Sequence, residues 1–119
     1  MIWASALSTR QNTDVSLTEI EHSIWSQLDG KRPDFVCAFV SSHHADNYRH
    51  IAQQCNELFK PRVSLGCSGA GLVGGGEERE SGPGIALCAA HLPDVSTFPF
   101  HIRQEQCPSA DAGPDAWAQ

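Results

Sequence analysis

Residues that could do chemistry are concentrated in a glycine-rich segment, Gly66 to Gly76, which follows a short apolar run. Six of the ten glycines of the chain lie there. Glycine loses the most backbone freedom on folding, so a dense cluster indicates backbone that turns with positive φ or approaches another group closely. Main-chain amides exposed in such a loop form a concave site for an anion. The candidate binding residues of this segment are Gly66, Cys67, Ser68, Gly69, Ala70 and Gly71.

The same segment spells G-x-G-x-x-G from Gly69 to Gly74. A dinucleotide site needs a helix after these glycines, because the N-terminus of that helix holds the pyrophosphate. Residues 77–84 are charged residues followed by Ser-Gly-Pro-Gly, a composition that cannot begin a helix of several turns. We therefore interpret the spelling as a coincidence.

Cys67 is also a candidate nucleophile, because backbone amides around a thiol at a strand end lower its pKa. A base such as His43 or His91 would have to approach it in space. The other interpretations are a ligand contact, or a small side chain packed beside glycines where nothing larger fits. The G-x-S-x-G elbow of hydrolases is not matched, because Ala70 stands where the last glycine is needed.

The other histidines and cysteines do not have the spacing of a metal site, since no pair has zinc-finger spacing with a matching second pair. Possible ligands are His43, His44, His50, Cys88, His91 and His101. Five cysteines are present, an odd number, and no two are close in the sequence. We interpret them as reduced thiols of a cytoplasmic protein and expect no metal.

Length and charge exclude several classes of protein. A chain of 119 residues forms one domain or part of one. Its formal charge of -6 argues against a nucleic-acid binder, which needs clustered Lys and Arg to neutralise phosphates. No apolar run approaches the roughly 20 residues that cross a bilayer, and the N-terminus lacks the basic region of a signal peptide.

The elements that must position the glycine segment alternate between strand and helix patterns. The first helix begins with a capping box at Ser16 and Glu19 and ends at Gly30, with apolar residues at helical spacing between them. The second helix begins near Asp46 and stops before Pro61. Strands are expected over residues 2–8, 34–40 and 62–67, and then over 85–92 and 95–103.

This order predicts an α/β fold, a β-α-β-α-β core with a mostly parallel sheet followed by an antiparallel hairpin. Residues 74–84 are interpreted as a mobile connection, and residues 105–119 as a linker and the start of a further element. Ligands of parallel sheets bind at the carboxyl ends of strands. Ser41 and Ser42 follow one such end, and we expect them to face the Gly66–Gly71 loop across one crevice.

The chain resembles the N-terminal FIST domain over about residues 1–104. Residues 2–9 look like the opening strand of that family, and residues 33–42 look like its second strand. The most specific part is Ser64-Leu65-Gly66-Cys67-Ser68-Gly69-Ala70-Gly71, followed by the charged stretch and Gly82-Pro83-Gly84-Ile85-Ala86-Leu87. This part resembles the "G-C-[ST]-x-[AG]-G" segment of the family and the strand after it.

The resemblance implies a sensory domain of intracellular signal transduction that binds a small ligand, with an amino acid as the expected class. Some members bind haem, but no histidine of this chain matches a defined haem motif, so no cofactor is assigned. The family normally continues into a C-terminal FIST domain or a downstream signalling module, which are the expected partners. The alternatives are an interaction or structural domain without a ligand, and a cysteine-dependent enzyme that uses Cys67.

Overall fold

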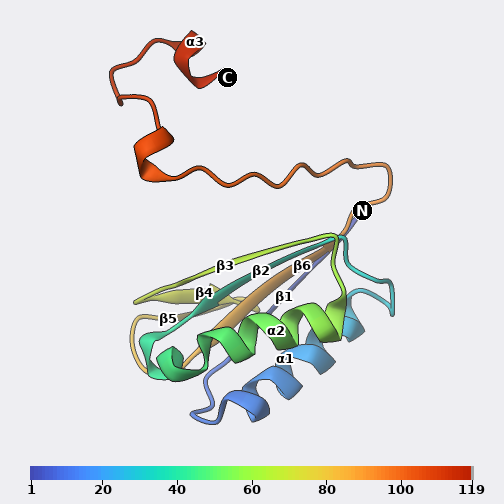
Figure 1. Cartoon of the computed structure of the whole chain (residues 1–119). Helices are drawn as coiled ribbons and strands as arrows, with labels where there is room; N and C mark the ends of the chain where they lie inside the picture. The colour runs from blue at the N-terminus through green and yellow to red at the C-terminus, as the bar shows by residue number, and fades with distance from the viewer. Residues whose placement is uncertain (119) are drawn as a thin grey trace.

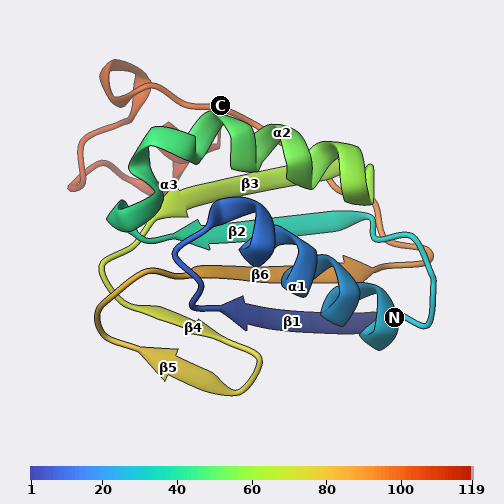
Figure 2. The same cartoon turned by 90° about the horizontal axis from the view of Figure 1, so that it is seen from below.

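The computed structural model describes residues 1–118 and shows a sheet with two helices packed on one face (Figures 1 and 2). The main elements are β1 (Ile2–Ser8), α1 (Thr13–Gln27), β2 (Phe35–Val40), α2 (Tyr48–Phe59), β3 (Val63–Ser68), β4 (Leu72–Gly74), β5 (Glu77–Arg79) and β6 (Ile85–His91). Short 3₁₀-helices η1 (Ser42–Asn47) and η2 (Gln104–Gln106) and the short helix α3 (Pro114–Trp117) complete the fold.

The first elements follow the expected β-α-β-α-β order, with η1 inserted before α2, but the sheet is mixed. Its strand order is β1-β6-β2-β3, and only β2 and β3 pair in parallel. β6 pairs antiparallel with both β1 and β2, so the expectation of a mostly parallel sheet is wrong. Five of the seven residues of β6 are buried, which fits a strand covered on both faces in the interior of the sheet, and β6 takes the position between β1 and β2.

The expected hairpin of residues 85–92 and 95–103 is also wrong. Residues 95–103 form no strand, and Figure 1 shows this segment leaving the sheet on the side opposite the helices. Both edges of β6 are already occupied by β1 and β2, and Pro99 has no amide hydrogen to donate to a ladder. Phe98 and Phe100 are consequently 84% exposed.

The hydrophobic core fills the layer between the two helices and the sheet. Phe59 at the end of α2 is buried, and its ring lies 5.8 Å from the ring of Trp25 on α1. The remaining core residues include Leu17, Ile20, Ile24, Leu28, Val36, Val40, Ile51, Cys55, Ile85 and Leu87. Burial of this apolar surface is what holds the helices on the sheet.

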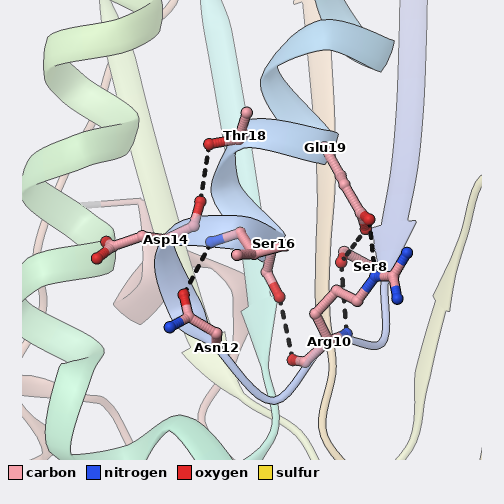
Figure 3. Close-up of polar contacts among 8 residues, drawn as sticks. Ser8, Arg10, Asn12, Asp14, Ser16, Thr18 and Glu19 are labelled. Carbon is pink, nitrogen blue, oxygen red and sulfur yellow. Dashed lines mark hydrogen bonds and ion pairs between the residues drawn. The ribbon is translucent and has the colours of Figure 1, made fainter.

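Helix α1 begins three residues before the expected capping box (Figure 3). Its cap is Asn12, whose side-chain oxygen accepts a hydrogen bond from the Val15 amide. The Ser16 hydroxyl instead donates to the Arg10 carbonyl. Glu19 accepts a hydrogen bond from Ser8 and pairs with Arg10, and these contacts hold the pKa of Glu19 below its ordinary value. The capping-box expectation is therefore wrong: both of its residues bind the loop before the helix.

The second helix also starts differently from the expectation, because η1 occupies residues 42–47 and α2 begins at Tyr48 rather than Asp46. It ends at Phe59, and Lys60 follows in the left-handed conformation at φ +45°. The stop before Pro61 is thus confirmed. Lys60 itself supplies the sharp change in chain direction that leads into β3.

Residues 72–79 form a β-hairpin instead of the expected mobile connection. β4 and β5 pair around Gly75 and Gly76, whose φ angles are +58° and +81°. Two consecutive positive φ values define a type I′ turn, which suits the twist of a two-residue hairpin and favours glycine. Gly74 packs the hairpin against the sheet, since an added Cβ would lie 2.9 Å from the Ala6 carbonyl oxygen.

The outer side of β1 is occupied by a side chain. The Gln27 side-chain oxygen accepts a hydrogen bond from the Ser5 amide, and its nitrogen donates to the Ser5 carbonyl. Gln27 thereby takes the place that a further strand would fill. β3 forms the opposite edge of the sheet and, within residues 1–118, pairs only with β2.

Candidate functional site

A pocket of about 390 Å³ opens between α2 and strands β2 and β3. Its walls are mostly apolar, and hydroxyl groups from α2 and β3 lie among them. The lining residues are Val36, Ala38, Val40, Tyr48, Ile51, Ala52, Cys55, Ser64, Leu65, Gly66, Cys67 and Ser68. The parallel β2–β3 pair turns alternate side chains toward α2, and small residues on β3 leave the space that forms the pocket.

Three of the predicted binding residues, Gly66, Cys67 and Ser68, line this pocket. Gly66 and Ser68 are register partners of the core residues Ala38 and Val40 and so lie on the α2 side of β3. Leu65 and Cys67 also border the pocket, but their side chains point to the other face of the sheet. The other glycine-segment residues, Gly69 to Gly71, follow the end of β3 and are not part of the lining. The Gly69 amide donates to the Val40 carbonyl at 3.0 Å, so it extends the pairing between the strands. The structure thus joins only the first half of the predicted loop to the cavity.

Ser41 and Ser42 are not brought to the pocket. Ser41 is 3% exposed, and its hydroxyl accepts a hydrogen bond from the Gly84 amide at 2.9 Å. Its own amide donates to the Gly84 carbonyl, so Ser41 ties the end of β2 to the start of β6. Ser42 is exposed in η1. Neither serine lines the pocket, so the pocket is not the expected crevice between these serines and the glycine loop.

Gly66 is required by the contact between two strands. A Cβ at this position would lie 2.6 Å from the Ala38 carbonyl oxygen, closer than any real contact allows. Gly66 and Ala38 are register partners in the parallel β2–β3 pair. The glycine therefore allows β3 to approach β2, and it places the neighbouring Cys67 and Ser68 beside the pocket.

Cys67 is exposed on β3, and His91 lies at the far end of the sheet from it. Cys67 is aligned with Phe39 and through it with Ala86, and His91 is five residues further along β6. At the rise of a strand this separation is about 17 Å. His91 is instead hydrogen-bonded to the Arg32 carbonyl and pairs with Asp34. His91 therefore does not act as the base that a Cys67 nucleophile needs.

The family model of the FIST N domain matches residues 34–116, which is more than half of the chain. The chain belongs to the FIST N domain family. The match contains β2, α2, β3, the hairpin and β6, and so includes every residue that lines the pocket. No curated protein and no solved structure matches the chain closely enough to add to this assignment.

Family membership indicates that this FIST domain has a sensory role in signal transduction. Within residues 1–118, no helix has the length and apolar character that a bilayer crossing requires. The same residues contain no group of three metal-ligating side chains close enough to hold an ion.

Several pocket residues of the FIST domain were not predicted as site residues. Tyr48, Ile51, Ala52 and Cys55 belong to the apolar stripe of α2, whose spacing predicts only that this face meets the sheet. The sequence feature that could have indicated the pocket is the combination of that apolar stripe with a run of small residues on β3, whose side chains leave space beside α2. Burial raises the pKa of the Cys55 thiol to about 11, so this pocket residue acts as an apolar wall.

His44 is the most buried titratable side chain that the pocket does not use. It is 1% exposed, and its Nδ1 lies 2.9 Å from the Thr13 hydroxyl at the start of α1. Among the described residues, its Nε2 is a buried nitrogen without a hydrogen-bond partner. Burial lowers the pKa of His44, so the folded FIST domain favours the neutral form of this imidazole.

Acidification is expected to destabilise the FIST domain through His44. The pKa of His44 is lower in the folded chain than in the unfolded chain. The contribution of the neutral imidazole to the free energy of unfolding is therefore complete above the unfolded pKa of about 6.5, and it is lost as the pH falls below that value. The slope from one histidine is at most about 1.4 kcal/mol per pH unit. Urea unfolding between neutral pH and about pH 5 measures this slope.

The matched comparison uses His44→Gln, which should flatten the pH dependence below neutrality, and His22→Gln at an exposed position of α1, which should retain the wild-type curve. An unchanged slope in His44→Gln would show that another group carries the effect.

Proposed function

We propose that this FIST domain is a cytoplasmic sensor that binds a small ligand of the amino-acid class in the pocket between α2 and β3. The pocket itself is the observation that carries the proposal. Its volume of about 390 Å³ lies in the range of small-molecule sites, which are mostly apolar with a few placed polar groups. An amino acid with an apolar side chain combines the two chemistries that the lining offers.

The polar end of such a ligand would meet the hydroxyls of Tyr48 and Ser68, which come from opposite walls of the pocket. The Ser64 hydroxyl donates to Asn56 and keeps lone pairs for a ligand donor. Tyr48 is the first residue of α2, and the positive end of a helix dipole favours a carboxylate nearby. The apolar end of the ligand would contact Val40 and Ile51.

Ligand binding would act on the end of β3, because Cys67 and Ser68 lead directly into Gly69, Ala70 and Gly71. A segment that becomes ordered on binding can transmit the event to a neighbouring domain. We propose a C-terminal FIST domain or a downstream signalling module as the receiver.

Calorimetric titration with a panel of amino acids tests this function. The variant Ala52→Phe should weaken binding at least about tenfold, because Ala52 lines the pocket and a ring at this position occupies the space. The control is Gln53→Phe, which adds the same side chain at the next, exposed position of α2, outside the lining. Equal affinities of both variants and the wild type would place the ligand elsewhere, and a panel without any binding would reject the ligand class.

A second candidate function is a protein-interaction domain, and one observation favours it. Trp3 and Leu65 are both 54% exposed, and Phe39 is 39% exposed, on the sheet face opposite the helices. A separately expressed C-terminal FIST domain is the partner to titrate. Binding that Trp3→Ser and Leu65→Ser weaken, together with an empty amino-acid panel, would favour this function over ligand sensing.

A further inference from the structure

Three cysteines lie on the sheet face that the helices do not cover. Val36, Ala38 and Val40 belong to the core between sheet and helices. Successive side chains of a strand point to opposite faces, so Cys37 lies on the other face. Cys88 lies between the core residues Leu87 and Ala89 and shares that face. The parallel register places Cys67 there too, beside Phe39.

Cys37 and Cys88 are directly opposite each other in the antiparallel β2–β6 pair. On the far side of β6, Cys88 is opposite Ser5, whose backbone groups bond to Gln27 and hence point away from β6. By the alternation of an antiparallel sheet, the backbone groups of Cys88 then point toward β2. The two cysteines form a hydrogen-bonded pair with Cα atoms about 5.5 Å apart, within the Cα separation of disulfides. The Cβ atoms of such a pair are about 5 Å apart, so a small approach of the two strands accompanies formation of the bond.

Access to this pair is asymmetric. Cys88 is half-buried and reachable from the open face, whereas Cys37 is 7% exposed. Cys67 is exposed but displaced by two residues along β3 from Leu65, the register partner of Cys37. That diagonal position is about 8 Å away, beyond the reach of a disulfide without backbone movement.

We propose that Cys37 and Cys88 are a reversible redox pair that forms a cross-strand disulfide by exchange with a small-molecule disulfide. The Cys88 thiol loses its proton, and the thiolate attacks one sulfur of the small disulfide, forming a mixed disulfide and releasing one thiol. The Cys37 thiolate then attacks the Cys88 sulfur and releases the second thiol. The two cysteines are oxidised by two electrons, and the small disulfide is reduced to two thiols.

The local environment sets the conditions for this reaction. Burial raises the pKa of Cys37 and of Cys88, so few thiolates are present at neutral pH. After burial, the neighbouring Cys88 and then Cys67 also raise the pKa of Cys37, with Cys88 the larger of the two. Disulfide formation should therefore be slow at neutral pH and faster as the pH rises.

The test is exposure of the full chain to oxidised glutathione, followed by alkylation, trypsin digestion and mass spectrometry without reductant. The lysines and arginines of the chain separate the five cysteines into five tryptic peptides. We expect a peptide pair joined through Cys37 and Cys88 in most molecules, two hydrogens lighter than its parts. Dithiothreitol should dissociate it.

Two variants make the result specific. Cys67→Ser should keep the joined pair, and Cys88→Ser should lose it while leaving Cys37 free to alkylate after unfolding. The oxidised wild type should also unfold at a higher urea concentration, because the bond closes a long loop in the unfolded chain. A link from Cys37 to Cys67, mixed disulfides alone, or a link that forms only in urea would each overturn the proposal.

Discussion

Replacing Phe59 with alanine is expected to lower the free energy of unfolding by about 3–5 kcal/mol, the usual cost of removing a buried phenylalanine ring. Phe59 is 1% exposed at the last position of α2 and packs against Trp25 of α1. Its loss leaves a cavity where the two helices meet the sheet. Urea unfolding followed by far-ultraviolet circular dichroism measures the change.

The matched control is Phe98→Ala, because the same side chain is 84% exposed there. We expect that substitution to change stability by less than about 0.5 kcal/mol. Similar losses at both positions would mean that residues 95–103 are packed in solution. A small loss of stability in Phe59→Ala would contradict the prediction, because it would mean that the surrounding core residues move into the cavity and fill it.

Gly66→Ala is expected to cost about 3 kcal/mol, at the upper end of the range for overpacking. The new methyl group would meet the Ala38 carbonyl oxygen at 2.6 Å, and that backbone atom cannot rotate away as a side chain could. β3 would have to move away from β2, and the pocket would lose its shape. We therefore expect reduced stability and reduced amino-acid binding in the same variant.

Gly71→Ala provides the comparison within the same glycine segment. Its φ is not positive, and an added Cβ would make an ordinary contact of 3.6 Å with the Arg79 carbonyl oxygen. This variant should fold with nearly wild-type stability and bind ligand with unchanged affinity, since Gly71 is outside the pocket lining. If Gly71→Ala folds stably but no longer binds the amino acid, the binding site would include the whole Gly66–Gly71 loop.

The sequence patterns that predicted structure correctly are those that depend on local spacing. Apolar residues at helical intervals predicted α1 and α2, and the continuous apolar run from Phe35 to Val40 predicted a buried strand. The position of β6 could not be predicted in this way. Its apolar run predicts burial on both faces, but it does not indicate that the neighbours of β6 are β1 and β2, because that order is a property of the tertiary fold.

Capping was mispredicted for a related reason. Ser16 and Glu19 have the spelling of a capping box, but Asn12 lies earlier and Glu19 has stronger partners in Ser8 and Arg10. The conformation of the loop between β1 and α1 determines which of these contacts form, and helical periodicity in the sequence does not predict that conformation.

The candidate site was predicted to the extent that it depends on one strand. Gly66, Cys67 and Ser68 lie on β3, and the pattern of glycines marked that strand end. The opposite wall comes from α2, and the distance between that helix and the edge of the sheet is a property of tertiary packing. Ser41 was assigned to the site because it follows β2, but its hydroxyl is used by Gly84.

The two edges of the sheet have different consequences for self-association. Gln27 occupies the outer backbone groups of Ser5, whereas β3 exposes its outer edge within residues 1–118. Addition of strands in both directions is what allows sheets to polymerise into fibres. Because only the β3 edge is open, one copy can pair with just one other copy. Two copies joined through their β3 edges about a two-fold axis would expose only their blocked β1 edges, so no third copy would be added.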